Sequence, residues 1–247
     1  MNSGLYGACA GLMARTQALD TIAANVANSS SAGFRGEENV FGTVLAEAER
    51  HGRMSALNKA TNSFSQIGES QIDTTQGTIT RTGNDLDLAI EGPGYFKIQS
   101  ATGTAYTRNG HFRTDANGRL LTDAGEPVLG DGGEIRLSKG KVSISANGTI
   151  SCDGAIAGKL SLVTFAPDTK LINHGGSEYG APAGSELSAS QASLQQGALE
   201  GSNVSPMEGV VQLITAQRAA ESMRHALTLI DGEMDRATVQ DLAKVSQ

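Results

Sequence analysis

The fold of this chain is decided at residues 3–28, which read SGLYGACAGLMARTQALDTIAANVAN. Apolar residues recur there at intervals of seven, as on the face of a helix that packs along a partner helix: Leu5, Leu12, Leu19 and Val26. Ile22 lies in the adjacent row, which Arg15 interrupts. Arg15 and Asp20 are the only charged residues among the first 34. A helix with one face in water normally carries charges there. We therefore predict a helix that other protein covers on several sides.

A second helix with the same spacing is predicted at the opposite end of the chain. Residues 203–245 read NVSPMEGVVQLITAQRAAESMRHALTLIDGEMDRATVQDLAKV. Ser205 is the expected cap, Pro206 the first helical residue and Glu208 the end of a capping box. Two heptad rows follow, namely Leu213, Ala220, Leu227 and Met234, and Ala216, Met223, Ile230 and Ala237. Such helices also occur in ordinary globular cores, but their positions at the two ends favour pairing with each other.

The first helix is predicted to end within residues 22–36, IAANVANSSSAGFRG. Asparagine and glycine tolerate left-handed backbone conformations, so Gly33 is expected to turn the chain outward. Uncharged amides such as Asn25 and Asn28 can hydrogen-bond across an interface without the desolvation cost of an ion. The alternative for these two asparagines is a simple helix cap.

The middle of the chain is predicted to be rich in β-structure. Asn109-Gly110, within TAYTRNGHFRTD, is a strong hairpin signal, and Asn117-Gly118 and Asn147-Gly148 also precede or separate expected strands. Further strands are expected at DLDLAI, GYFKIQ, EIRLS and KLSLVTF. Turn signals recur every 8 to 12 residues or so, the spacing of an all-β domain. The expected fold is α+β, with paired heptad helices forming an inner core domain and the β-rich middle forming an outer domain.

The expected domain organisation follows these composition changes. Residues 1–45 and 204–247 form the helical core domain, and residues 76–190 form the outer domain. A polar, extended connector is expected at 46–75, and a return connector at 191–203.

Composition excludes several classes of protein. The 247 residues are enough for a sizeable core, and the net charge of -7 argues against a nucleic-acid binder. No apolar run is long enough for a membrane span, and no secretory signal peptide is expected. Cys9 and Cys152 are isolated, so we expect two small buried hydrophobic residues and no disulfide framework.

Catalytic and metal motifs are not evident. The four histidines have no metal-ligand spacing: His51, His111, His174 and His225. The EGPGYF stretch at 91–96 is interpreted as a tight turn in preference to a phosphate loop. Asp85 and Asp87 could serve in acid–base chemistry, but we expect them to be solvated aspartates at a loop edge. No catalytic residue, cofactor or metal is predicted.

Several stretches resemble the flagellar rod and hook protein family. AANVANSSSAGFR is similar to the family signature A-N-N-[LI]-A-N-x-x-T-x-G-[FY]-[KR], with Ala24 in place of the first Asn and Ser31 in place of the Thr. Three further blocks resemble the family in its own order: TGNDLDLAIEGPGYFKIQ, YTRNGHFRTDANGRLLTDAGEPVLG and QGALEGSNVSPMEGVVQLITAQRAAES. Blocks such as VLGDGGEI and the total length favour a proximal rod member, with the distal rod as the close alternative and the hook as a weaker one.

The resemblance implies a non-enzymatic subunit of the bacterial flagellar rod. It further implies export through the flagellum's own apparatus without a cleaved signal, location in the periplasmic rod, and contacts with other copies and neighbouring rod proteins. Nucleic-acid binding and membrane insertion are not expected. The predicted assembly residues are Leu5, Leu12, Leu19, Ile22, Asn25, Val26, Asn28, Gly33, Phe34, Leu213, Met223, Leu227, Ile230 and Met234. Two other classes remain open, a secreted β-domain binding module and an enzyme acting on the cell wall.

Overall fold

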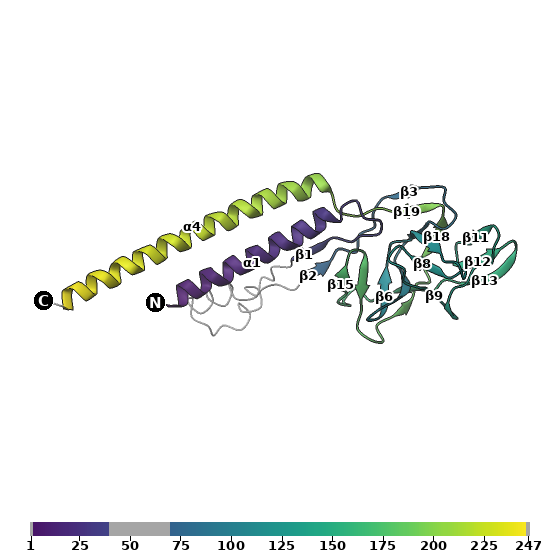
Figure 1. Cartoon of the computed structure of the whole chain (residues 1–247), viewed down its shortest axis with the longest axis horizontal. Helices are drawn as coiled ribbons and strands as arrows, with labels where there is room; N and C mark the ends of the chain where they lie inside the picture. Colours follow the sequence, from purple (N-terminus) through teal and green to yellow (C-terminus); the bar gives the residue numbers. More distant parts are fainter. Residues whose placement is uncertain (1, 40–69, 246–247) are drawn as a thin grey trace. The chain divides into compact units, whose positions relative to one another are not determined.

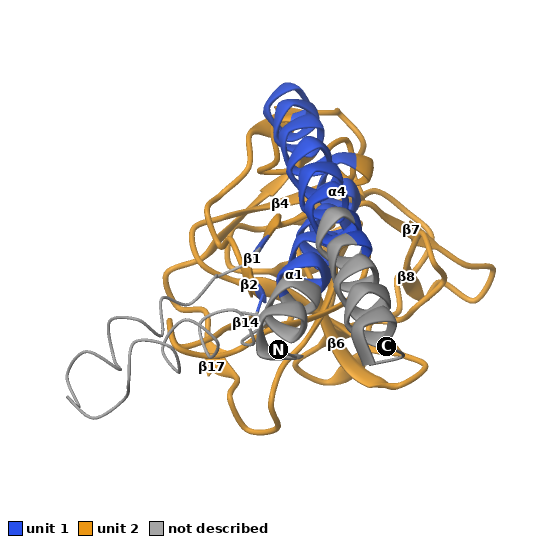
Figure 2. Ribbon diagram, turned by 90° about the vertical axis from the view of Figure 1, so that its left-hand side faces the viewer, with its two compact units in different colours: residues 1–26, 38–70, 206–247 blue, residues 27–37, 71–205 orange. Residues whose placement is uncertain are grey.

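A computed structural model of the chain describes residues 2–39 and 70–245, and it divides into two compact units (Figures 1 and 2). Unit 1 comprises Met1–Val26, Glu38–Ser70 and Pro206–Gln247. Unit 2 comprises Ala27–Glu37 and Gln71–Ser205. Helices at both ends and strands between them confirm the α+β class.

Two helices make up most of the described part of unit 1. They are α1 (Asn2–Ala27) and α4 (Pro206–Val245), which run antiparallel (Figure 1). Pro206 is the first residue of α4, as its fixed backbone angle predicts. The helices approach closely at one end, where a Cβ added to Gly209 would lie 2.5 Å from Cγ2 of Val26. Neither helix, in the parts described, is long and apolar enough to cross a membrane.

An eight-stranded sheet is the largest in unit 2. Its path is β10-β9-β5-β6-β16-β15, and β14 pairs with both β5 and β17. The bounds are β5 Tyr95–Ser100, β6 Gly103–Thr107, β9 Val128–Gly130, β10 Gly133–Glu134, β14 Leu162–Thr164, β15 Ile172–Gly175, β16 Glu178–Gly180 and β17 Leu187–Ser188. Every pairing in it is antiparallel.

Smaller sheets complete the β-structure. Three strands pair in the order β11-β12-β13, with bounds β11 Val142–Ile144, β12 Thr149–Cys152 and β13 Ala155–Lys159. Four strand pairs are also present: β1 (Glu37–Asn39) with β2 (Ser70–Ile72), β3 (Ile79–Arg81) with β19 (Ala198–Glu200), β4 (Leu88–Glu91) with β18 (Ser193–Gln196), and β7 (Phe112–Thr114) with β8 (Leu120–Thr122).

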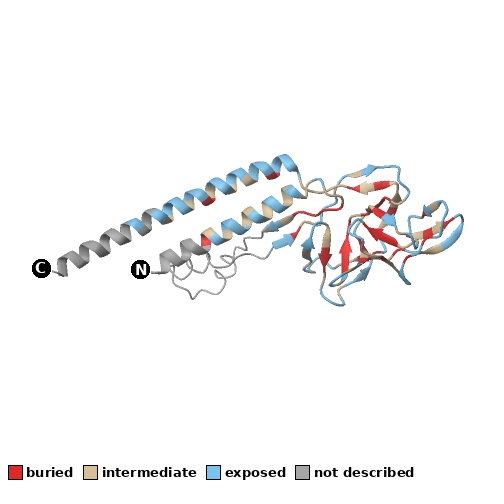
Figure 3. Ribbon diagram, in the orientation of Figure 1, coloured by how far each residue is buried: buried red, intermediate tan, exposed pale blue. Residues whose placement is uncertain are grey.

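The buried side chains of unit 2 form two hydrophobic clusters, and Figure 3 shows buried residues along its strands. The larger cluster is aliphatic and includes the edge-to-face pair Phe96 and Phe112. Cys152 is a buried free cysteine of this cluster, as expected. The smaller cluster is built around Tyr95, Tyr106 and Tyr179. This aromatic cluster lies beside the buried charges described below.

The three Asn-Gly turns have different outcomes. Asn147-Gly148 joins the paired strands β11 and β12, and Asn117-Gly118 joins the paired strands β7 and β8. Gly148 and Gly118 have positive φ angles of 86° and 77°, which such turns need.

The hairpin predicted at Asn109-Gly110 is wrong, because β6 pairs with β5 and β16 whereas β7 pairs with β8. Glycine is needed there because the backbone of Leu88 passes close to it: a Cβ on Gly110 would lie 1.7 Å from the Leu88 carbonyl oxygen. The Leu88 N–H donates to the Gly110 carbonyl oxygen at 3.0 Å, so the segment lies against β4 and does not fold back.

Two boundaries differ from those expected. The range 191–203, expected to be a return connector, contains β18 and β19, which pair with β4 and β3. Residues 27–37 were expected in the helical domain but group with unit 2. The physical reason in both cases is long-range hydrogen bonding, as in the bond from the Gly33 N–H to the Glu200 carbonyl oxygen at 2.8 Å.

Candidate functional site

The segment that leaves α1, Asn28–Gly36, makes the most distinctive site among the residues that the structure describes. It begins with a turn, in which the Ser31 N–H donates to the Asn28 carbonyl oxygen at 3.0 Å. Gly33 follows with a φ of +66°, and a Cβ there would lie 2.2 Å from the Arg108 carbonyl carbon. Both the left-handed backbone and the close approach therefore require glycine at this position.

The next two residues are buried inside unit 2. Phe34 is 1% exposed, and so is Arg35, although it carries a full charge. The Arg35 N–H donates to the Tyr179 hydroxyl at 2.8 Å, and its guanidinium Nη2 lies 2.7 Å from Oε1 of Glu200. Burial of an ion without a partner is costly, so Glu200 is what allows Arg35 to be buried.

Glu200 is the centre of this buried cluster. Its Oε1 also accepts from the Gly77 N–H at 2.9 Å, and its Oε2 lies 2.9 Å from Nη1 of Arg108. The Arg108 guanidinium donates further to the carbonyl oxygens of Ile90 at 3.2 Å and Gly92 at 2.7 Å. The single carboxylate on β19 therefore joins the exit of α1, the segment before β3 and the segment after β6.

The cluster carries two arginines for one carboxylate. Burial lowers the pKa of the Arg108 guanidinium, an effect that Glu200 counteracts and Arg35 reinforces. The Arg108 guanidinium also lies 5.3 Å from the centre of the Tyr95 ring, a distance suited to a cation–π contact. Burial raises the pKa of the Tyr95 hydroxyl, so this ring stays neutral and adds no negative charge.

Asn203 closes the same region by a second route. Its Oδ1 accepts from the Gly36 N–H at 2.7 Å, while its Nδ2 donates to the carbonyl oxygens of Asp73 and Thr75 at 3.0 Å and 3.2 Å. The Asn203 N–H donates to the Phe34 carbonyl oxygen at 3.3 Å. One amide side chain therefore ties together the segments that enter and leave unit 2.

Glu200, Arg108 and Asn203 were not singled out from the sequence. A signal for them existed, because Arg108 lies in the family-like block at 106–130, and the other two lie in the block at 196–222. What the sequence does not reveal is that these charges are buried and meet each other.

The predicted assembly residues fall into three groups. Gly33 and Phe34 are buried in unit 2, and Asn25 and Asn28 are half-buried at the end of α1. The helical residues Leu12, Leu19, Ile22, Val26, Leu213, Met223 and Leu227 are half-buried. Leu5, Ile230 and Met234 lie outside the residues whose side chains the structure describes.

On α4, the less exposed positions follow one face. They are Gly209, Leu213, Ala216, Ala219, Ala220, Met223 and Leu227. All but Ala219 are separated alternately by four and three residues, which places them along one side of a helix. The pair Val26 and Gly209 shows that α1 lies against this side at the start of α4.

The burial of the two aspartates Asp85 and Asp87 differs in part from the expectation that both are solvated. Asp85 is exposed, but Asp87 is buried and has three polar partners. Its carboxylate accepts from Thr82 Oγ1 at 2.6 Å and Asn84 Nδ2 at 2.9 Å, and it lies 2.6 Å from His111 Nδ1. The expectation of a solvated Asp87 is therefore wrong. An isolated β-bridge between Asp87 and His111 places the histidine beside the carboxylate. The hydrogen bonds that Thr82 and Asn84 donate to this carboxylate stabilise the loop before β4.

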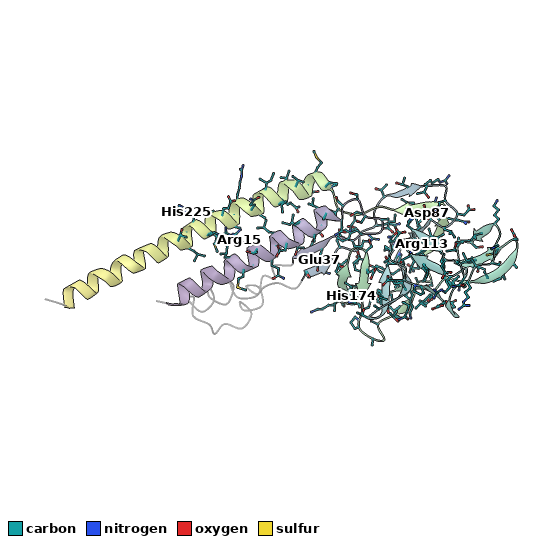
Figure 4. The ribbon with its side chains drawn as sticks, viewed as in Figure 1. Arg15, Glu37, Asp87, Arg113, His174 and His225 are labelled. Carbon is teal, nitrogen blue, oxygen red and sulfur yellow. The ribbon has the colours of Figure 1, made fainter. Side chains whose placement is uncertain are left out.

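Of the other histidines, His51 lies outside the described residues, and the remaining two do not lie at a common site. His174 lies on β15 and His225 on α4, in different units (Figure 4). Within the described residues, no group of three or more His, Cys, Asp or Glu side chains could hold a metal ion.

Comparisons with known proteins agree along the chain. Three family models match, each to a different region: the flagella basal body rod protein model at residues 5–35, the flagellar hook protein FlgE/F/G D1 domain at 89–152, and the flagellar basal body rod FlgEFG protein C-terminal model at 195–237. These matches include Arg35, Arg108 and Glu200.

Full-length relatives give the same result. A flagellar basal-body rod protein FlgF of Caulobacter vibrioides is 33% identical, with 100% of both chains covered. A FlgF of Mesorhizobium japonicum is 32% identical over 90% of each chain. A FlgG of Bacillus subtilis is 33% identical, covering 94% of this chain and 96% of its own. The expected resemblance to the flagellar rod family, with the proximal rod protein FlgF first and the distal rod protein FlgG as the close alternative, is confirmed. The chain therefore belongs to the flagellar basal-body rod protein family.

Proposed function

We propose that this chain is a structural subunit of the flagellar rod, which assembles axially through its terminal helices and transmits torque. One observation carries the proposal: the helices of unit 1 have apolar residues on more than one face, and their mutual pairing covers one face only. On α4, Val211 and Ile214 are exposed although Leu213 between them is half-buried. Such faces suit a helix that ends up inside an assembly.

The heptad rows give a register for the pairing within one subunit. Val26 lies against Gly209, and the antiparallel direction then sets Ile22 opposite Leu213 and Leu12 opposite Met223. Full burial of one aliphatic side chain contributes roughly 1.5–3 kcal/mol. Ordering entropy opposes each contact, so the helices gain most of their stability when neighbours cover their remaining faces.

The buried cluster around Glu200 supports a mechanical role. A rod that transmits torque needs the chain between its helical and β-rich parts to resist bending. The ion pair between Arg35 and Glu200 fixes residues 33–36 to β19, and Arg108 pairs with the same carboxylate. Removal of one partner from a buried pair is strongly destabilising, so this attachment within unit 2 is costly to break.

The proposal includes partners and location. The subunit contacts other copies and neighbouring rod proteins, passes through the flagellar export apparatus, and resides in the periplasmic rod. The names of the FlgF and FlgG relatives support the basal-body location. No catalytic role is proposed.

Two deletions test this function in cells that lack the chromosomal copy. A chain without residues 2–26 loses α1 but keeps all of unit 2. We expect a folded, monomeric protein that fails to enter isolated basal bodies. A second chain, without residues 2–36, also loses Phe34 and Arg35, and we expect its unit 2 to be destabilised.

Three outcomes would contradict the proposal. Entry of the shorter deletion into basal bodies would exclude assembly through α1. Unfolding of unit 2 in that same variant would favour a β-domain whose helices merely close its core. Turnover of peptidoglycan by the purified full chain would indicate a cell-wall enzyme.

A further inference from the structure

The first turns of α4 carry an exposed apolar stripe. Its members are Met207, Val210, Val211 and Ile214, which are 83%, 44%, 63% and 48% exposed. Their spacing places them on one side of the helix, opposite the side of Gly209 and Leu213 that faces α1. Figure 3 shows this part of α4 as largely exposed. The stripe ends at Arg218, an exposed residue one turn beyond Ile214.

The last turns of α1 carry a face of the opposite character. Ala23, Ala24 and Ala27 are exposed, and Asp20 is exposed one turn before Ala24. Small side chains allow a second helix to approach closely, so large apolar residues can pack onto them. This face also points away from the side of Val26 that meets α4.

The two faces match in register when the helices run antiparallel. If Val211 is set opposite Ala27, Ile214 falls opposite Ala24, and Arg218 falls opposite Asp20. Neither Asp20 nor Arg218 belongs to an ion pair among the described residues. The same register therefore packs large residues on small ones and pairs two opposite charges.

We propose that the α4 stripe of one subunit docks, antiparallel, on the alanine face of α1 in a second copy of this chain, with Arg218 beside Asp20. This proposal rests on the proposed rod function and names the surface that carries it. The side of α4 that faces its own α1 is not used, so both contacts can exist together. Charge complementarity identifies the occupant, because the chain itself supplies both halves of the match.

The resulting assembly is open and polar. The two faces lie on opposite sides of the helix pair, so one neighbour cannot cover both. The interface is therefore heterologous, and each subunit keeps one free face of each kind for the next copy. Since α4 is antiparallel to both its own α1 and the α1 of its neighbour, successive α1 helices point in the same direction. A polar filament has this property.

Cysteine cross-linking between different copies tests the contact directly. Ala24→Cys and Ile214→Cys are made in separate full-length chains, each with Cys9→Ser, and the chains are mixed and oxidised mildly. Cys152 is buried and does not compete. We expect a covalent dimer with a disulfide between positions 24 and 214. A mixture of Ala24→Cys with Thr228→Cys, which lies further along α4, is the matched control and should lose this dimer.

Charge exchange gives an independent readout of the register. Asp20→Arg or Arg218→Asp alone should weaken self-association by about fivefold, the upper end for an exposed ion pair. The double exchange should restore it. Ile214→Ser should weaken it by at least about tenfold, because an aliphatic contact is lost. Arg224→Asp, which removes the same charge from another side of α4, should leave it unchanged.

The outcomes separate this proposal from the function on which it rests. If the chain self-associates but the disulfide between positions 24 and 214 does not form, the docking is wrong and the rod function stands. The docking is also wrong if Ile214→Cys cross-links in cells to a different protein and not to a second copy. If the unmodified chain neither self-associates nor enters basal bodies, both proposals fail.

Discussion

At the scale of single residues, Glu200 sets the conformation of the segment that leaves α1. Its two carboxylate oxygens contact two arginines and a backbone N–H, and its carbonyl oxygen accepts from Gly33. Three nitrogens of the arginines, Arg35 Nε and Nη1 and Arg108 Nε, make no hydrogen bond within the described residues. The cluster therefore has fewer hydrogen-bond acceptors than donors. Loss of the Glu200 carboxylate would leave both arginines without their counter-ion.

Removal of the charge of Glu200 should be costly. We expect Glu200→Gln to lower the free energy of unfolding of unit 2 by about 3–5 kcal/mol, because two buried guanidinium groups lose their counter-ion. Urea unfolding followed by tyrosine fluorescence measures this. Glu134→Gln is the control, since Glu134 lies 4.0 Å from Arg136 on the surface and should change stability by no more than about 0.5 kcal/mol. Equal effects of the two substitutions would exclude the central role of Glu200.

Gly33 is expected to tolerate no side chain. Gly33→Ala should cost at least about 2 kcal/mol, because it combines a left-handed backbone with a clash against Arg108. Gly132→Ala is the matched control: no atom lies within 4 Å of its Cβ position and its φ is not positive. Thermal unfolding of both variants gives the comparison, and a neutral Gly33→Ala would contradict the observed geometry.

Prediction from the sequence worked at Gly33 and failed at Asp87. An outward turn at Gly33 follows from local backbone preference, which a sequence shows directly. Asp87 is buried where His111 reaches it from the segment before β7, and Glu200 is buried where Arg35 and Arg108 converge on it. Such convergence depends on tertiary pairing, so residue type and spacing do not reveal it.

At the scale of elements, the same dipeptide has two uses. Asn117-Gly118 and Asn147-Gly148 make the turns of hairpins, where positive φ is needed. Asn109-Gly110 instead allows β4 to pass close to the backbone. Local sequence predicts a turn at each place, but only the strand pairing decides which strands the turn connects.

The contact between α1 and α4 can be tested by one substitution whose effect on helix stability should reverse between two backgrounds. Gly209→Ala should lower helix stability by up to about 2 kcal/mol, since its Cβ meets Val26. In a Val26→Ala background, the same substitution should stabilise by about 0.5–1 kcal/mol, through helix propensity alone.

Gly232→Ala provides the control for that experiment. No atom lies within 4 Å of its Cβ position, so it should be stabilising in both backgrounds. Circular dichroism at 222 nm during thermal unfolding follows the helices. A stabilising Gly209→Ala in the unmodified chain would show that α1 and α4 do not meet at this point.

A carboxyl pair makes unit 2 sensitive to pH. Burial and the neighbouring Glu126 raise the pKa of Glu178 on β16 to about 7. A raised pKa means that the folded state favours the protonated acid. The stabilisation is therefore complete below the ordinary pKa and is lost as the pH rises towards 7.

The corresponding experiment compares two glutamates. Glu178→Gln should flatten the decline in stability between pH 5 and pH 7 or so, an effect of no more than about 1 kcal/mol because the group is partly solvated. Glu186 affects the pH dependence of stability in the opposite direction, because Lys97 and Tyr106 lower the pKa of its carboxyl. Its stabilisation is lost only as the pH falls through that lowered value. An unchanged pH profile in Glu178→Gln would contradict the raised pKa.

At the scale of the whole molecule, the two units should unfold separately. The described helices of unit 1 are largely exposed, whereas unit 2 has extensive buried clusters. Three of the four tyrosines, Tyr95, Tyr106 and Tyr179, lie in unit 2, and the chain has no tryptophan. We expect the helical signal at 222 nm to melt at a lower temperature than the near-ultraviolet tyrosine signal. Coincident transitions would instead show a single cooperative unit.

The α+β class could be predicted from the sequence because helices and strands leave different periodicities at the ends and in the middle. The placement of residues 27–37 in unit 2 could not, because those residues carry the composition of a helix end. Their partners, Tyr179, Glu200 and Asn203, come from distant parts of the chain.

The distance in sequence between Arg35 and Glu200 has a consequence for folding kinetics. A chain that emerges amino end first presents Arg35 early and its counter-ion only after most of unit 2 has appeared. Closure of such a long loop is entropically unfavourable and slow, and it is rewarded only when the last strand pairs. The ion pair between Arg35 and Glu200 therefore forms late. A nascent chain that stops before residue 200 leaves Arg35 hydrated and the exit of α1 free to move.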